Sequence, residues 1–167
     1  MLKTILISAC LLAITDPIAN DLALGAVTSD VTLSGKAMTC FNTSQTPVGG
    51  VIVGFYRLSS ARPLAAHLDS MARFPGFGPD GADPTAGAQF DALEAAMQSM
   101  AFSTPVIYRR TSAADGTFSI TISPVDSVLV LGYENMEDEN YVWDYKIMNA
   151  TVSTTFVLDM SRGVCGH

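Results

Sequence analysis

Apolar and polar residues alternate along several short segments of the chain. Residues 31–40 alternate with a period of two, and residues 51–56 form an unbroken β-branched and aromatic run. Alternation is typical of a half-buried strand, and such a run is typical of a central strand. Turn-forming residues separate further runs of this kind. The pattern therefore predicts seven strands, at residues 31–40, 51–56, 106–111, 118–122, 128–131, 141–148 and 151–158.

A different period appears between the second and third predicted strands. Leu64, Leu68 and Met71 recur at helical spacing behind Pro63, which we expect to be the first helical residue. Residues 89–100 have the same spacing in an Ala-rich background. The sequence thus predicts a mainly β antiparallel sandwich with a two-helix insertion at about residues 60–104.

The N-terminal segment has the layout of a secretory signal peptide. Lys3 precedes a largely apolar run at residues 5–14. We expect residues 1–25 to be the signal and residues 26–167 to form a single domain in a secreted, extracellular protein. Cys10 also fits a bacterial lipoprotein box loosely, which leaves a lipid anchor as the alternative. No later run approaches the roughly 20 apolar residues of a membrane-spanning helix, so no membrane span is expected.

Composition narrows the class of protein. The chain has 167 residues, and its 49% hydrophobic content is enough for a globular core rather than a disordered tail. Its 9 Lys and Arg against 16 Asp and Glu give a net charge of −7. A surface of this sign repels phosphate backbones, so nucleic acid is not an expected partner.

The cysteines and two asparagines predict covalent modification. Once Cys10 leaves with the signal, Cys40 and Cys165 remain, and an even pair in an oxidising compartment predicts a disulfide bond between them. Two buried thiols are the alternative. Asn42 and Asn149 each begin an N-glycosylation triplet. Either asparagine is otherwise an unmodified polar turn residue.

The helical insertion is unusually rich in aromatic and methionine side chains. Such side chains suit an irregular apolar ligand, and they equally suit packing of both helices on one face of the sandwich. Fully burying four of them contributes about 6–12 kcal/mol of gross stabilisation, so packing alone accounts for their presence. The candidate ligand or partner surface consists of Phe74, Phe77, Phe90, Met97 and Met100.

Two further groups of side chains lie on predicted strands. Tyr141, Trp143 and Tyr145 share one face, which is an aromatic platform for a sugar or protein if that face is outside and part of the core if it is inside. Arg109 and Arg110 point to opposite faces of the sheet. We expect one to be exposed and the other either to pair with a nearby carboxylate or to form an anion site.

Residues for catalysis or metal binding are scarce. His67 and His167 are the only histidines, which leaves little for a zinc site or a Ser-His-Asp relay. The acidic residues at 134–140 lack the stagger of an EF-hand, so a solvated loop is expected there. We expect no metal, no cofactor and no enzymatic activity.

Several short motifs resemble those of the transthyretin-like (prealbumin-like) sandwiches. The motifs are Gly35-Lys36, with Cys40 ending the strand, then Pro47 before a Val-rich strand, and Asp115-Gly116-Thr117-Phe118. The sequence is most similar to the nematode transthyretin-like secreted proteins, over residues 31–58 and 108–160. Carboxypeptidase regulatory-like modules share the same motifs. The resemblance implies a seven-stranded Greek-key sandwich secreted from the cell, and the helical insertion departs from it.

These observations favour a secreted binding module. Its expected partner is an extracellular or cell-surface protein, a glycan, or a small hydrophobic or lipid ligand. The alternative is a structural or interaction protein of an extracellular layer without a small-molecule ligand.

Overall fold

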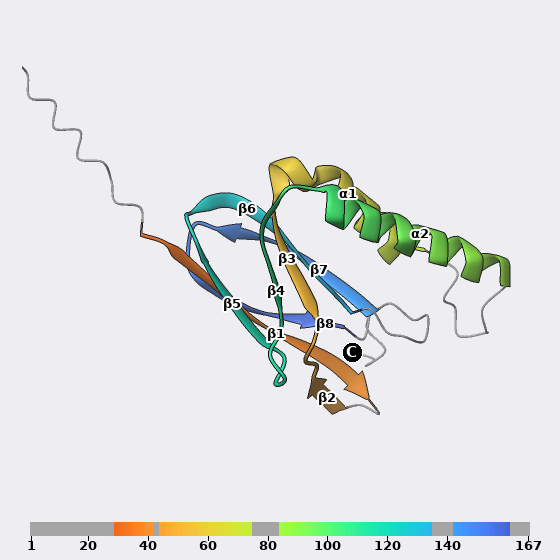
Figure 1. Ribbon diagram of the computed structural model, residues 1–167, viewed down its shortest axis with the longest axis horizontal. Helices are drawn as coiled ribbons and strands as arrows, with labels where there is room; N and C mark the ends of the chain where they lie inside the picture. The colour runs from red at the N-terminus through yellow and green to blue at the C-terminus, as the bar shows by residue number, and fades with distance from the viewer. Residues whose placement is uncertain (1–28, 42–43, 75–83, 135–141, 161–167) are drawn as a thin grey trace, which may run out of the picture.

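The computed structural model describes residues 29–41, 44–74, 84–134 and 142–160. These residues form two facing sheets and two helices (Figure 1). The β1 sheet contains β1 (Val31–Phe41), β2 (Ser44–Pro47), β5 (Thr117–Ile122) and β8 (Thr154–Asp159). The β3 sheet contains β3 (Ile52–Arg57), β4 (Val106–Thr111), β6 (Val125–Glu134) and β7 (Val142–Ala150). The helices, α1 (Leu58–Ala72) and α2 (Pro84–Ser103), come between β3 and β4. The prediction of a mainly β protein with two helices is confirmed.

The two sheets differ in topology. The β3 sheet has the order β4-β3-β6-β7, and all its neighbouring strands are antiparallel. In the β1 sheet, β1 pairs with β2 and β5 in antiparallel fashion and with β8 in parallel. Since β5 and β8 both pair with residues 33–36, they lie on opposite edges of β1.

Three details of the predicted fold differ from the structure. The described residues contain eight strands rather than seven, because β2 forms where a loop was expected, so the helices follow the third strand. The seven-stranded Greek key is therefore not confirmed. Helix α1 begins at Leu58, and Pro63 lies inside it on the exposed side, where the hydrogen bond that proline cannot make faces solvent. Helix α2 extends beyond the predicted 89–100 at both ends.

The β3 sheet is buried on both faces, which explains its unbroken apolar runs. Val53, Phe55 and Val130 belong to the core between the two sheets. Tyr56 and Leu131 belong to a second core between the β3 sheet and the helices. Alternate residues of β3 and β6 therefore enter different cores, and both faces must be apolar. In Figure 1 the helices lie on the side of the β3 sheet away from β1.

Two of the sequence motifs meet in the core between the sheets. Gly35 of β1 pairs with Phe118 of β5. A Cβ atom on Gly35 would lie 2.3 Å from Cζ of the Phe118 ring. That ring is held between Phe55 and Phe156, with centroid distances of 6.2 and 5.5 Å. Glycine is needed at position 35 because an aromatic ring covers its backbone.

Candidate functional site

The apolar residues predicted as a ligand surface lie in the layer between the helices and the β3 sheet, as far as they are described. Phe90 is 6% exposed and Met97 is fully buried. Phe74 and Met100 are half-buried against the same cluster, and the rings of Phe74 and Phe90 lie 5.8 Å apart. Phe77 lies outside the described residues. All four described side chains thus have packing partners within the fold.

The predicted modification sites are only partly described. Cys40 belongs to β1, whereas Cys165 and Asn42 lie outside the described residues. Asn149 is exposed at the end of β7. Its Oδ1 accepts hydrogen bonds from the backbone N and the Oγ1 of Thr151, at 2.7 and 2.5 Å. The disulfide bond and both glycosylation sites therefore stay predictions.

His67 joins the two helices. Its Nε2 donates a hydrogen bond to the backbone carbonyl of Leu93 at 2.8 Å, while His167 and residues 135–140 lie outside the described part of the chain. Among the described residues, no three or more His, Cys, Asp or Glu side chains are grouped so that they could hold a metal ion. None of the described helices is long and apolar enough to cross a membrane.

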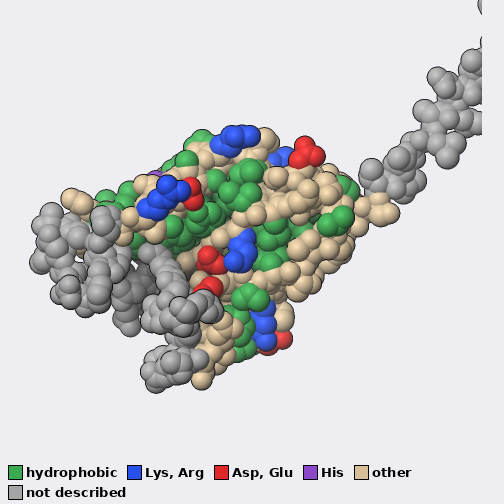
Figure 2. Space-filling model, turned by 180° about the vertical axis from the view of Figure 1, so that it is seen from behind, with side chains coloured by type: hydrophobic (Ala, Val, Ile, Leu, Met, Phe, Trp, Pro, Cys, Tyr) green, Lys and Arg blue, Asp and Glu red, His purple; other side chains and the backbone are tan. Residues whose placement is uncertain are grey.

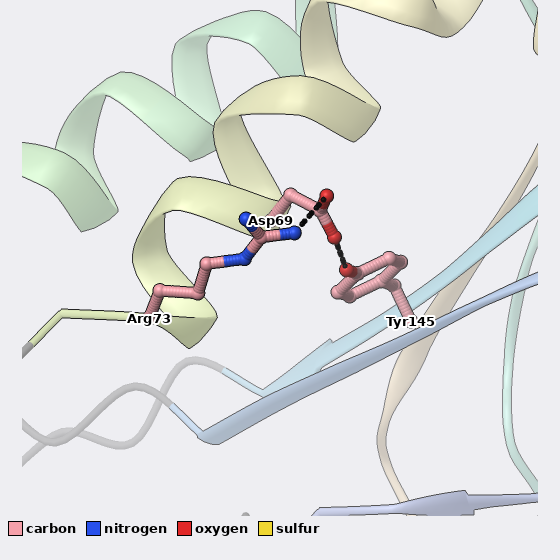
Figure 3. A network of polar contacts seen from close by, with 3 residues as sticks. All are labelled: Asp69, Arg73 and Tyr145. Atoms are coloured by element: carbon pink, nitrogen blue, oxygen red, sulfur yellow. Dashed lines mark hydrogen bonds and ion pairs between the residues drawn. The ribbon is translucent and has the colours of Figure 1, made fainter.

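The predicted aromatic face lies beneath the helices. Trp143 is buried and stacks on Tyr145 at 6.2 Å, whereas Tyr141 is not among the described residues. The Tyr145 hydroxyl donates a hydrogen bond to the Asp69 carboxylate, which also accepts one from Arg73 at 3.1 Å (Figure 3). Burial, followed by the hydrogen bond to Asp69, raises the pKa of Tyr145 to about 12. This network fixes α1 on β7.

A shallow hollow of about 510 Å³ lies beside this network. Its described lining comes from one helix, α1, with Ala66, Asp69, Ser70, Arg73 and Phe74. Of its three polar side chains, Asp69 and Arg73 already bind each other, which leaves Ser70. The hollow therefore offers weaker recognition than the cluster described next.

Arg109 and Arg110 point to opposite sides of β4, as predicted. Arg109 donates from Nη2 to the Ala101 carbonyl at 2.9 Å, and Arg110 donates from Nη1 to the Ser119 carbonyl at 3.0 Å. The ion pairs found within the described residues join Arg73 to Asp69 and Lys146 to Asp144. The expectation that one of these arginines pairs with a nearby carboxylate is therefore wrong for the described residues, since both instead bind carbonyl oxygens.

Gly54 makes the space in which Arg109 meets Tyr56. It pairs with Arg109 in β4, on the face of the β3 sheet that the helices cover. A Cβ atom on Gly54 would lie 2.5 Å from the Tyr56 hydroxyl, so the tyrosine ring lies back over the glycine. The hydroxyl then donates to the same Ala101 carbonyl that accepts from Arg109, at 3.1 Å. Two side chains from the sheet thus cap the end of α2, where positive charge is favourable.

Phe102 and Tyr133 complete this group. The Phe102 ring centroid lies 4.8 Å from Cζ of Arg109, and its edge contacts the Tyr133 ring at a centroid distance of 6.4 Å. We call Tyr56, Arg109 and Tyr133 the arginine–tyrosine cluster, with Phe102 as its cover. The sequence marks Phe102 as an aromatic residue of the insertion and Tyr133 as one of the strand region, but it does not predict that they meet Tyr56 and Arg109 in one site. The available signal was Gly54, a glycine inside an otherwise bulky strand.

Hydrogen bonding and burial keep Arg109 and Tyr133 protonated. The hydrogen bond with Tyr56 raises the pKa of Arg109, with a smaller opposing effect of burial. Burial raises the pKa of Tyr133, and the nearby Arg109 charge opposes this shift. Near neutral pH Arg109 is therefore charged, and the Tyr133 hydroxyl keeps its proton.

Exposed apolar side chains surround the cluster at one edge of the molecule. Phe102 is 62% exposed, and Val106 and Tyr108 are also exposed. Strand β4 pairs with β3 alone within the described residues, so its other side is an open strand edge. We call this surface, made by Phe102, Val106, Tyr108 and Arg110, the α2–β4 edge.

A second set of exposed apolar residues lies on β7, β8 and the turn between them. It comprises Ile147, Val152 and Val157. Figure 2, which shows the molecule from behind, has hydrophobic side chains at the surface among scattered charges of both signs. The cation–aromatic contact found among the described residues joins Arg109 to Phe102 and involves none of these three residues, so the α2–β4 edge is the better candidate site.

Comparisons with known proteins leave the family open. No protein-family model and no curated protein matches the sequence. Among solved structures, the chain is similar to a proposed carbohydrate-binding protein of Pseudomonas aeruginosa, at 12% identity over 78% of this chain and 88% of that one, with a TM-score of 0.44. It is also similar to a shaft pilin of Lactobacillus rhamnosus GG, at 11% identity over 78% of this chain and 49% of the pilin, with a TM-score of 0.37. Membership of the nematode transthyretin-like family is not confirmed and stays a prediction.

Proposed function

We propose that the protein is a non-catalytic binding module, exported from the cell, that pairs with an extended acidic segment of a partner protein along β4. The observation that carries the proposal is the exposed Phe102 ring over Arg109, directly beside an open strand edge. Aromatic and arginine side chains contribute most of the binding energy in many protein interfaces. The predicted signal peptide supports export.

The open edge supports pairing with an extended segment. Backbone groups on the outer side of an edge strand are available to a further strand, and alternate side chains then give specificity. In β4, Tyr108 and Arg110 form a row of exposed side chains at alternate positions, and Val106 is exposed on the other side of a shift in register. An added strand can therefore hydrogen-bond to the backbone of β4 while its side chains contact this row.

Local charge favours an acidic partner over a second copy of this protein. The chain as a whole carries a net charge of −7, yet neither Arg109 nor Arg110 forms an ion pair with a described carboxylate. Pairing β4 with β4 of a second copy would bring four guanidinium groups together in one short ladder, and like charges in such a ladder are destabilising. An acidic strand neutralises the same groups.

A small apolar ligand within the insertion has less support. Phe90 and Met97 are buried between α2 and the β3 sheet. Cores are packed as densely as organic crystals, so a ligand there would have to displace these side chains. The exposed residues of the α2–β4 edge need no such rearrangement.

The proposal is tested with a blocked peptide of valine and glutamate, as long as β4, in which two successive glutamates place one carboxylate on each face of the added strand. We expect binding in fluorescence anisotropy, and slower hydrogen exchange of the β4 amides when the peptide is bound. Arg110→Glu should weaken binding at least tenfold, about 1.4 kcal/mol. Lys146→Glu makes the same charge reversal on β7, the far edge of the same sheet, and should bind as the native protein does.

A second pair of variants tests the aromatic contact. Phe102 and Val152 are each 62% exposed, but only Phe102 lies at the α2–β4 edge. Phe102→Ser should weaken peptide binding, and Val152→Ser should not.

Equal effects of Arg110→Glu and Lys146→Glu on peptide binding, or unchanged hydrogen exchange of the β4 amides, would contradict the proposal. Self-association without the peptide would favour the structural-layer alternative.

A further inference from the structure

We infer that the Phe102 ring covers a binding site for a carboxylate group, held by the Nε–H of Arg109 and the hydroxyl of Tyr133. This inference rests on the proposed function, because the carboxylate belongs to an acidic side chain of the strand that pairs with β4. It adds where that side chain binds and which groups recognise it.

These two polar atoms have no hydrogen-bond partner in the described chain. Tyr133 is 3% exposed, and its hydroxyl forms no hydrogen bond. The Nε of Arg109 is also buried and unpaired, although Nη2 of the same side chain binds the Ala101 carbonyl. Leaving a buried polar group unpaired costs about 1–3 kcal/mol. Two such groups beside one exposed ring indicate a bound acceptor rather than a requirement of the fold.

The chemistry of the two donors defines the acceptor that they bind. The Nε–H group can only donate, and the Tyr133 hydroxyl keeps its proton because burial raises its pKa. Two donors beside one guanidinium charge fit a group with two acceptor oxygens and a single negative charge, which describes a carboxylate. A dianionic phosphate would leave a second negative charge buried without a partner, which is strongly unfavourable.

Access to the two donors depends on the Phe102 side chain. Phe102 is the second-last residue of α2 and is largely exposed, so rotation of its side chain leaves the core between α2 and the β3 sheet in place. Its ring contacts both Arg109 and Tyr133. Moving this one ring therefore uncovers both unpaired donors. The ring can then pack on the apolar part of the acidic side chain.

The test uses the full-length protein and sodium propionate, which reproduces the end of a glutamate side chain. In ¹⁵N-labelled protein the Nε–H resonance of Arg109, identified by its loss in Arg109→Lys, reports on the donor itself. Propionate should move this resonance saturably, with a dissociation constant of about 10 mM, as expected for a single weak contact. Propionamide, its neutral analogue, should bind at least fivefold more weakly.

Three variants make the result specific. Phe102→Ala uncovers the site and should bind propionate at least as tightly as the native protein. Tyr133→Phe removes one donor and should weaken binding about fivefold. Tyr145→Phe removes a hydroxyl that binds Asp69 elsewhere and should have no effect. Equal shifts with propionate and propionamide, or no shift in Phe102→Ala, would overturn the inference by showing that the donors bind water or any neutral acceptor.

The same peptide with glutamine in place of each glutamate separates this inference from the proposed function. If the glutamate peptide binds and the glutamine peptide binds equally well, pairing along β4 stands and the carboxylate site is wrong. If neither peptide binds, the proposed function itself fails. If the glutamate peptide alone binds and loses about fivefold in affinity with Tyr133→Phe, both proposals are supported.

Discussion

The hydroxyl of Tyr145 on β7 donates a hydrogen bond to the carboxylate of Asp69 on α1 (Figure 3). This contact joins the helical layer to the β3 sheet on the β7 side. On the opposite side, Tyr56 and Arg109 bind the Ala101 carbonyl at the end of α2. The helices are thus fixed by polar contacts at two edges of the sheet, with an apolar core between them.

Removing the Tyr145 hydroxyl should destabilise the protein in a pH-dependent way. Tyr145→Phe should lower the free energy of unfolding by about 0.5–1 kcal/mol near neutral pH, which is less than is usual for a charged hydrogen bond because Asp69 is exposed to solvent. The pKa of Tyr145 is raised from 10 to about 12 on folding. The unfolded chain therefore loses this proton first, and the contribution of the hydroxyl declines as pH rises from about 10 to 12.

Urea denaturation of native protein and Tyr145→Phe across this pH range tests the prediction. The difference in unfolding free energy should be constant below pH 9 or so and should shrink above about 10. Tyr108→Phe, at an exposed position on β4, is the control. A difference that stays constant to the highest pH would contradict the assigned hydrogen bond.

The sequence predicted those parts of the fold in which burial imposes a repeating pattern of apolar residues. Strand β1 alternates because one face is buried, and β3 is uniformly apolar because both faces are. Strand β2 was not predicted because all four of its residues are exposed. Its sequence therefore lacks a buried apolar face and is typical of a loop. The extra turns of α2 were missed because the pattern there lacked apolar residues at helical spacing.

The candidate site was harder to predict because it depends on register. Tyr56, Arg109 and Tyr133 come from three different strands, and only the pairing of β3 with β4 and β6 brings them together. The sequence did predict that Arg109 and Arg110 point to opposite faces. It could not show that Gly54 leaves room for the Tyr56 hydroxyl, because that depends on how the ring lies over its neighbour.

Gly35→Ala should destabilise the fold by about 1–3 kcal/mol, as overpacked core variants do. The new methyl group would lie 2.3 Å from Cζ of Phe118, and Phe55 and Phe156 limit how far that ring can move. Adding Phe118→Leu should recover part of the loss, which thermal unfolding of the double variant measures. Gly87→Ala is the control, because nothing lies within 4 Å of a Cβ there and alanine favours the helix by up to about 1 kcal/mol. Additive effects of the Gly35 and Phe118 changes would contradict the proposed close contact.

Asp144→Asn should stabilise the protein near neutral pH. Burial raises the pKa of Asp144, although its Oδ2 accepts a hydrogen bond from the Asp159 backbone N at 2.7 Å. A carboxyl whose pKa rises on folding opposes folding when it is ionised, and this opposition disappears as pH falls below the unfolded value of 3.8. Asparagine keeps an acceptor oxygen without the charge.

The melting temperatures of native protein and Asp144→Asn should therefore differ most near neutral pH and converge in acid. Asp91→Asn, at an exposed position on α2, serves as the control for removing one negative charge. A lower melting temperature for Asp144→Asn than for native protein near neutral pH would mean that the ionised group stabilises the fold, and would contradict the prediction.

Export and the predicted disulfide bond can be tested on one sample. Protein recovered from the culture medium should lack about 25 N-terminal residues, as expected for signal cleavage. Its intact mass should rise by two protons on reduction if Cys40 and Cys165 are bonded. In the chain-entropy model, closing so long a loop stabilises the fold by roughly 4–5 kcal/mol, so reduction should lower the melting temperature substantially.

Single cysteine variants identify the bond. Cys40→Ser and Cys165→Ser should each melt at the temperature of the reduced native protein, because each removes the same cross-link. Cys10→Ser should melt as the oxidised native protein does, because Cys10 lies within the predicted signal peptide. Two free thiols in unreduced, denatured mature protein would exclude the bond. In that case only the predicted signal peptide would support an extracellular location of the α2–β4 edge.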